Sequence, residues 1–511
     1  MNKGRTFLAF KNSVIAGFVT LLNFPIQFIN RFFMIRYLGI TYLGLTSLYA
    51  NIIGVLSLAD LGIGTAIVFM LYKPLGEQDV EKVSVLMKYY RNIYRCIALI
   101  ILVLGICVIP FLKFFIGKSI DYPHVYLLFI IYLLGAVSSY FFSYNQSLLY
   151  ADQRNNIVSW INLIVNYIML TIQIMTVLFF KDPLLYAILF VFSNFITNIF
   201  LSIYVRKNYS IKLTKKSLDK SEKKLLLQNV IGNGFLRISG VIVTGTDSIL
   251  LSAFAGIIQV GIYANYVTIV NVIQRFMIQV IGAITGSIGN FITNKNSRDG
   301  KILFYNLQFI NFILVNIACL GIYFLINDVV LLWIGKKYIL CNLNVFLIAI
   351  SFYFMNYRML GWNFVSVYGL SRYMKIFSIN EIIANVALSL IFLVVFKLKL
   401  TGILLGNIFS TLFTVMWQDP YIIFKKGFHT TTKKYFKRYI YNLFILGLEF
   451  IVIGFLAVLS EKLLTDPITR LIIMGIIIII VGSVMPISFY LKTSEFRYLL
   501  TLIKKIKGDF N

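Results

Sequence analysis

The sequence is short of charged residues, and most of the charge that it carries is of one sign. Only 13 % of its 511 residues are Asp, Glu, Lys or Arg, whereas 59 % are hydrophobic and the mean hydropathy is +0.86. A soluble globular protein has about 25 % charged residues. The deficit excludes an ordinary soluble protein and indicates a membrane protein, with room for a dozen or more apolar spans of about 20 residues each.

Residues that commonly carry catalysis or bind metals are also scarce. The chain has two histidines and four cysteines, and the cysteines lack the spacing of a metal site. It contains no Walker A loop, no nucleophile elbow and no DXD-like sugar-nucleotide site. These absences disfavour an ATP-driven pump and a lipid-linked glycosyltransferase. We therefore expect no enzyme activity, no metal and no cofactor.

Acidic residues are few: 19 Asp and Glu stand against 47 Lys and Arg, a formal net charge of +28. The basic residues fall between apolar runs, where they set membrane orientation, so we do not expect a nucleic-acid partner. With an even number of spans and both termini in the cytoplasm, most Lys and Arg fall on the cytoplasmic side. Lys and Arg are most frequent in the loops 206–224 and 425–438 and in the tail from Lys492. These segments are also suited to contact anionic lipid headgroups.

The apolar runs predict an all-α polytopic protein with about fourteen transmembrane helices. The second and eighth runs are long enough to require tilting, kinking or re-entry. The spans are expected near residues 12–36, 41–71, 92–116, 125–150, 157–180, 183–205, 227–254, 257–292, 303–326, 342–368, 373–396, 400–424, 439–460 and 468–491.

The chain repeats itself. An offset of 217 residues aligns Asn12 with Asn229, Gly17 with Gly234, Gly39 with Gly256 and Gly44 with Gly261, and an offset of 218 aligns Arg154 with Arg372. We therefore expect two lobes of six spans, 1–225 and 226–426, followed by an extra pair of spans and a basic tail in 427–511. Six is even, so the lobes should be parallel repeats, an arrangement that places a substrate site at their interface.

Four arginines lie within apolar spans, where an arginine costs about 2.5–3.5 kcal/mol on insertion scales. They are Arg31, Arg237, Arg275 and Arg358. Guanidinium groups bind phosphate oxygens bidentately, so a cavity that gathers these side chains suits a phosphate-bearing substrate. Alternatively, each arginine snorkels or pairs with a nearby carboxylate or carbonyl. Both interpretations stay open for Arg31, near the external end of its span, and for Arg358; for Arg237 and Arg275 we favour the cavity.

Other polar residues in or beside the spans have two readings as well. Asp60 and Asp247 are the clearest intramembrane acids, with Glu381 and Glu449 as weaker cases; each is an ion-pair partner or a proton or sodium site. Arg154 and Arg372 end the fourth span of each half at the cytoplasmic face. They either meet a phosphate at the entrance or cap the helix and anchor headgroups.

These residues carry a family resemblance. Arg36-Tyr-Leu-Gly39 followed by Tyr42-Leu-Gly-Leu45, then Leu56 to Gly64 and the polar ending Ala151 to Arg154, resembles the polysaccharide-transporter branch of the multidrug/oligosaccharidyl-lipid/polysaccharide (MOP) superfamily, to which the MATE transporters also belong. Within that branch the chain is most similar to Wzx-type flippases for O-antigen and capsule repeat units.

The resemblance implies a V-shaped bundle of two six-helix lobes that alternates between inward-open and outward-open states. Such a protein moves an undecaprenyl-pyrophosphate-linked oligosaccharide to the external leaflet of the bacterial cytoplasmic membrane. Glycosyltransferases and a polymerase of the same pathway would be its partners. A proton or sodium gradient that acts through Asp60 or Asp247 is a separate hypothesis for what drives transport. The extra span pair resembles that of lipid-II-type flippases, where a groove can hold the lipid tail. Two alternatives stay open: an ion-coupled drug or metabolite antiporter of the superfamily, and a flippase for lipid II or teichoic acid precursors.

Overall fold

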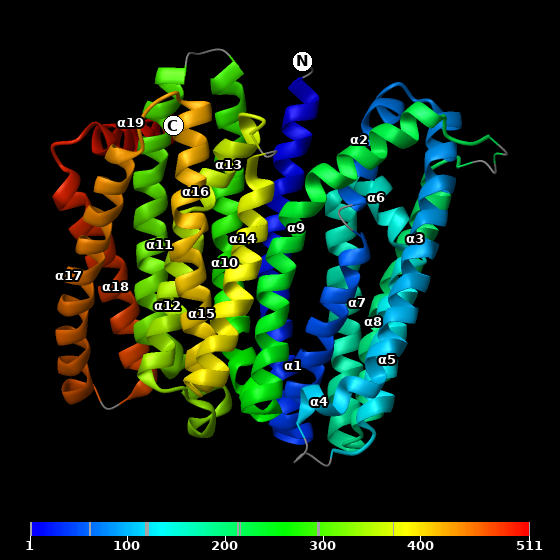
Figure 1. Ribbon diagram of the computed structural model, residues 1–511, viewed down its shortest axis with the longest axis horizontal. Coiled ribbons are helices and arrows are strands. Elements are labelled where there is room, and N and C mark those ends of the chain that lie inside the picture. The colour runs from blue at the N-terminus through cyan, green and yellow to red at the C-terminus, as the bar shows by residue number, and fades with distance from the viewer. Residues whose placement is uncertain are drawn as a thin grey trace. The chain divides into compact units, whose positions relative to one another are not determined.

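The structure is a computed structural model in which the described residues are 3–60, 63–117, 122–211, 214, 216–293, 297–370, 373–464 and 466–509. The side chains of some helical residues within these ranges, among them 227–239, are outside the description. The described chain is helical and has no strand (Figure 1). It divides into a first unit, Met1–Ala264, and a second unit, Asn265–Asn511.

In the first unit, α1 packs mainly against α7 and α9, and α8 packs against α5 and α7. The elements of this unit are α1 (Lys3–Leu56), η1 (Ser57–Asp60), α2 (Ile63–Gly76), α3 (Val80–Val108), η2 (Ile109–Phe111), α4 (Leu112–Ile116), α5 (Val125–Tyr140), α6 (Ser143–Ala151), α7 (Asn155–Phe179), α8 (Pro183–Asn208), α9 (Lys220–Ala255) and the start of α10 (Ile257–Thr293).

In the second unit, α11 lies against α12 and α18, and α14 packs along α15. Figure 1 shows α17 and α18 as a pair beside α11. Besides the rest of α10, the elements are α11 (Ser297–Ile334), η3 (Lys336–Tyr338), α12 (Asn342–Tyr357), α13 (Met359–Val367), α14 (Met374–Leu390), η5 (Ile391–Val395), α15 (Lys399–Phe413), α16 (Val415–Ile422), η6 (Ile423–Gly427), α17 (Lys433–Leu463), α18 (Pro467–Tyr490) and α19 (Ser494–Asp509).

Eleven helices of the described chain are long and apolar enough to cross a membrane, or twelve if the bent pair α5 and α6 forms one span. The protein is therefore an all-α multi-pass membrane protein, while the predicted number of fourteen spans is not confirmed. Part of the difference arises in α1, where Leu22–Leu56 counts as one span. This helix is in fact two helices joined at a kink at Gly39, whose backbone (φ 88°, ψ 164°) is non-helical. Two shorter apolar stretches, Ala66–Gly76 and Gly240–Ala255, overlap the ends of the expected second and seventh spans.

Several of the few acidic residues begin helices. The side chain of Asp182 accepts a hydrogen bond from the backbone N–H of Leu184 at 2.7 Å, and Asp466 accepts one from Thr469 at 2.8 Å. Each aspartate is followed by a proline at the first helical position, which needs no hydrogen-bond donor. These caps close the connection from α7 to α8 and end the connection from α17 to α18.

A glycine-lined helix crossing reproduces the sequence repeat within the first unit. Gly256, between α9 and α10, has nearly the same backbone conformation (φ 90°, ψ 157°) as its repeat equivalent Gly39, in a region that is essentially restricted to glycine. A Cβ added at Gly44 would approach the carbonyl oxygen of Ile257 to under 3.0 Å, and one at Gly261 would approach that of Ile40 equally closely. The two repeats thus make the same close contact reciprocally.

Candidate functional site

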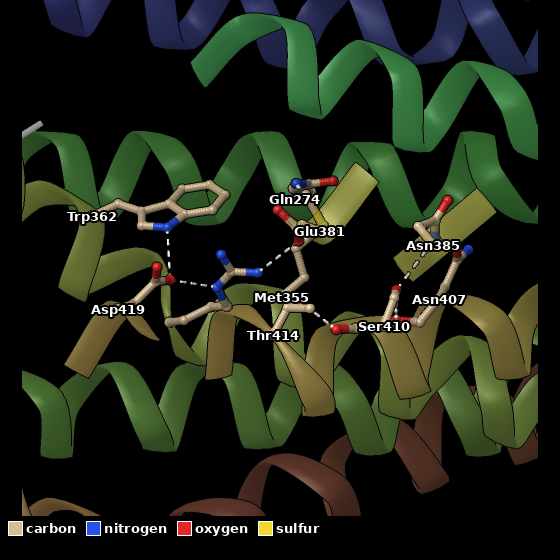
Figure 2. A network of polar contacts seen from close by, with 10 residues as sticks. Gln274, Met355, Trp362, Glu381, Asn385, Asn407, Ser410, Thr414 and Asp419 are labelled. Atoms are coloured by element: carbon tan, nitrogen blue, oxygen red, sulfur yellow. Dashed lines mark hydrogen bonds and ion pairs between the residues drawn. The ribbon is translucent and has the colours of Figure 1, made fainter. Parts of the chain in front are cut away.

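A buried cluster of charged residues in the second unit surrounds Arg358, which lies at the junction of α12 and α13. Figure 2 labels its partners Asp419, Glu381 and Trp362. Its Nε donates to Asp419 Oδ2 on α16 at 2.8 Å, and its Nη1 donates to Glu381 Oε1 on α14 at 3.1 Å. The side chains of Arg358, Asp419 and Glu381 are only 8 %, 2 % and 15 % exposed. One guanidinium therefore connects the bend between α12 and α13 to two other helices.

Trp362 on α13 completes this cluster. Its ring centroid lies 4.7 Å from the Arg358 guanidinium, and its Nε1–H donates to the same Asp419 Oδ2 at 2.9 Å. Figure 2 shows the Trp362 indole and the Asp419 carboxylate joined by this hydrogen bond. Arginine stacks on aromatic rings and binds carboxylates through a rigid fork, whereas lysine does neither as well. These contacts require an arginine at this position. The charge of Arg358 is already paired with the carboxylates of Asp419 and Glu381.

Asp419 is the charged residue of this cluster that was not predicted from the sequence. It stands between Gln418 and Pro420 inside an otherwise apolar run, and that polar interruption is the signal that could have found it. The oxygen Oδ1 of Asp419 is buried and has no hydrogen-bond partner among the described residues. Glu449 is also fully buried, on α17, and accepts a hydrogen bond from the amide of Asn316 on α11.

The other intramembrane arginines have different surroundings. Arg31 on α1 is half-buried, and its Nη1 is enclosed without a hydrogen-bond partner in the described part of the chain. Arg275 on α10 has an exposed side chain. Neither is paired with a carboxylate of any described residue. Arg237 lies on α9, and its side chain is outside the described residues.

The remaining predicted site residues are placed as follows. Asp60 lies half-buried in η1, and Asp247 on α9 is 7 % exposed. Arg154 follows α6 at a helix end, where its Nε is 2.8 Å from Asp152 Oδ2 and its Nη1 donates to the Tyr204 hydroxyl at 3.1 Å. Burial lowers the pKa of Arg154, but the Tyr204 hydrogen bond and the nearby Asp152 outweigh that effect and hold it above its usual value. Arg372 is outside the described residues.

Comparison with known proteins places the chain in a family. Residues 9–285 match the family described as polysaccharide biosynthesis protein, which is more than half of the 511 residues. The chain belongs to this family. No curated protein matches the sequence.

Solved structures share the fold of this polysaccharide biosynthesis protein. It is 16 % identical to an inward-facing multidrug resistance MATE family transporter of the MOP superfamily, with a TM-score of 0.65 over 81 % of this chain and 99 % of that one. It is also 16 % identical to the lipid II flippase MurJ in an inward closed conformation, with a TM-score of 0.63 over 93 % of this chain and 99 % of that one.

A third similar structure is a mutant MATE transporter of Vibrio cholerae, 16 % identical, with a TM-score of 0.56 over 82 % of this chain and 97 % of that one. The expected MOP-type, MATE-like fold is therefore confirmed. The similar structures are titled as transporters and a flippase, in agreement with the prediction that the chain is not an enzyme.

Proposed function

We propose that the protein is a flippase that moves an oligosaccharide linked to undecaprenyl pyrophosphate from the cytoplasmic to the external leaflet of the bacterial cytoplasmic membrane. Both termini lie in the cytoplasm, glycosyltransferases of the pathway supply the substrate, and a polymerase consumes it. Family membership and the MOP-type fold support a membrane flippase for polysaccharide synthesis. In this proposal the lobes 1–225 and 226–426 rock against each other, the pair α17 and α18 holds the lipid tail, and Arg154 and Arg372 meet the headgroup at the entrance.

The observation that supports a pyrophosphate-bearing substrate is that some intramembrane arginines are paired with carboxylates and others are not. Arg358 is neutralised by two carboxylates at 2.8 and 3.1 Å, whereas Arg31 and Arg275 pair with no carboxylate of the described residues. An unneutralised arginine within a membrane is costly and is retained where it meets an anion or a watery cavity. A pyrophosphate offers several oxygens for bidentate guanidinium contacts. A cationic drug, by contrast, would be repelled.

Replacing Arg31 or Arg275 with alanine should lower transport without removing the protein from the membrane. A hydrogen bond to a charged group contributes about 1.5–3 kcal/mol, so each substitution should reduce surface polysaccharide by about tenfold or more in a strain that lacks its own flippase. Arg237→Ala belongs in the same series. The matched control is Lys462→Ala, which removes an exposed charge at the end of α17 and should leave surface polysaccharide unchanged. Full activity of Arg31→Ala, Arg237→Ala and Arg275→Ala would contradict the proposed substrate.

Ion coupling through Asp60 or Asp247 is a separate part of the proposal, because an intramembrane carboxylate can bind a proton or a sodium ion. In sealed vesicles that contain the protein and a lipid-linked oligosaccharide, collapsing both gradients should stop net transport. Asp60→Asn or Asp247→Asn should remove the dependence on the gradient while leaving downhill exchange. Transport that is unchanged after collapse of the proton and sodium gradients would show that the flippase is not driven by them.

A further inference from the structure

The first unit contains a pocket of about 450 Å³ between α1, α5, α6, α7 and α8. This volume lies within the range of small-molecule sites. The described residues that line it include no Asp, Glu, Lys, Arg or His, yet about half of them are polar. Its most distinctive groups are four amides and two aromatic rings, from Gln146, Asn162, Asn194, Asn198, Tyr132 and Phe190. The pocket is thus separate in chemistry from the charged site around Arg358.

Three of the amides have no side-chain partner in the described part of the chain. Asn162, Asn194 and Asn198 form no side-chain hydrogen bond with another described residue; Asn194 is exposed, and the amide atoms of the half-buried Asn162 and Asn198 are not enclosed. Asn194 and Asn198 are one turn apart on α8, so both lie on the same face of that helix. Each amide can donate two hydrogen bonds and accept two more. Polar groups inside a membrane protein require partners, so this capacity is directed at a ligand or at water.

The hydroxyl groups of the pocket supply the complementary function. Ser57, Ser139 and Ser143 donate their protons to backbone carbonyl groups three or four residues earlier in the chain, those of Ile53, Ala136 and Ser139, at 2.8, 2.7 and 2.7 Å. Their oxygens therefore remain available as acceptors, while the amides provide the donors. Phe190 is 38 % exposed and lies 5.6 Å, centroid to centroid, from the ring of Tyr132. The pocket offers donors, acceptors and an aromatic surface together.

The amides are not a general requirement of the repeated fold. Asn194 corresponds to Thr411 or Leu412, and Asn198 to Val415 or Met416, at the offsets of 217 and 218 residues, so neither offset places an amide at these positions in the second half of the chain. The second half thus builds the corresponding helix, α15 continuing into α16, without this pair of amides. Their presence in one half only indicates a role in binding and not in helix packing.

We propose that this pocket binds a neutral sugar unit of the transported oligosaccharide, a subsite that rests on the proposed flippase function. A sugar ring presents adjacent hydroxyl groups, which pair with amides and hydroxyl oxygens, and an apolar face, which packs on an aromatic ring. A phosphate requires cationic groups that the lining lacks. An organic cation would find no carboxylate. A single bare metal ion would leave most of the 450 Å³ unfilled.

The test uses the purified full-length protein in lipid nanodiscs and a panel of methyl glycosides of glucose, galactose and N-acetylglucosamine. Saturation-transfer NMR should detect saturable binding of at least one glycoside. The double variant Asn194→Leu and Asn198→Leu keeps the branched shape of both side chains and removes both amides. It should weaken that binding by about tenfold or more, because each lost partner leaves a sugar hydroxyl unpaired. The control is Asn208→Leu on the same helix, whose amide is exposed and bonds to the Tyr204 carbonyl outside the pocket; its binding should equal that of the wild type.

The outcomes separate this proposal from the function on which it rests. Absence of saturable glycoside binding, or equal binding by the double variant, overturns the sugar subsite. The same follows if sodium or potassium ions, and no glycoside, bind in a manner that depends on Asn194 and Asn198. If Arg275→Ala loses surface polysaccharide while the double variant binds glycosides like the wild type, the flippase function is supported and the sugar subsite is wrong. Suppose instead that glycoside binding depends on the two amides, but neither Arg275→Ala nor the double variant lowers surface polysaccharide. The pocket would then be a sugar-binding site, and the flippase assignment would be wrong.

Discussion

Replacing Arg358 with methionine should destabilise the protein by about 3–5 kcal/mol, because it leaves two buried carboxylates without a counter-charge. Asp419 and Glu381 would lose their ion pairs at 2.8 and 3.1 Å, and Trp362 would lose the cation above its ring. The measurement is the thermal unfolding of the purified protein in detergent, together with the amount of folded protein recovered from the membrane. Both should fall strongly relative to the wild type.

Further variants show whether charge is the cause. Arg358→Lys retains the charge but cannot bind two carboxylates and stack on Trp362 at once, so it should fall between wild type and Arg358→Met. Adding Asp419→Asn and Glu381→Gln to Arg358→Met should restore part of the stability, since neutral replacement of a buried ion cluster is often tolerated. Arg206→Met, at an exposed position near the end of α8, is the matched control and should be neutral.

The same experiment decides between the two interpretations of Arg358 that the sequence left open. If Arg358→Met unfolds like the wild type but abolishes transport, the arginine is a substrate ligand and its ion pairs are incidental. If stability and transport fall together and both return in the neutralised triple variant, the arginine holds α13, α14 and α16 in place. The contacts in Figure 2 favour the second result.

Hydrophobicity made the class of the protein predictable, because a membrane protein must present long apolar helices to lipid. The repeat was also readable, since Gly39 and Gly256 share a backbone conformation that other residues rarely adopt. Identical glycines 217 residues apart therefore report identical local geometry. The kinked helix α1 contains the first expected span and only the start of the second, which shows why the number of spans is harder to derive than their presence.

The site was less accessible from the sequence, because its contacts join residues far apart in the chain. Arg358 and Asp419 are separated by 61 positions and meet only through the packing of α13 against α16. The pocket of Asn162, Asn194 and Asn198 could not be predicted for another reason: its residues are neutral, and a neutral amide within a span is a weaker signal of function than a charged residue. Amides one helical turn apart within an apolar run, as at Asn194 and Asn198, are the pattern that would have revealed it.

Replacing Gly44 with alanine should prevent the close crossing of α1 and α10 in the first unit. The added Cβ would overlap the backbone carbonyl oxygen of Ile257, and a backbone atom cannot rotate away as a side chain can. Overpacking of this kind costs about 1–3 kcal/mol, and more where the backbone must move. Thermal unfolding and recovery of folded protein should both decrease, and Gly261→Ala should have a similar effect through the carbonyl of Ile40.

The crossing also predicts how the two substitutions combine. Each alanine alone forces the same two helix segments apart, so the second should add less than the first, and the double variant should be less destabilised than the sum of the single variants. The control is Gly321→Ala in α11, where an added Cβ meets no atom within 4 Å; removing a helical glycine there should raise stability by about 0.5–1 kcal/mol. Gly44→Ala and Gly261→Ala proteins as stable as Gly321→Ala would show that the helices do not approach at these glycines. Strictly additive losses would instead show that the two glycines serve separate contacts and not one reciprocal crossing.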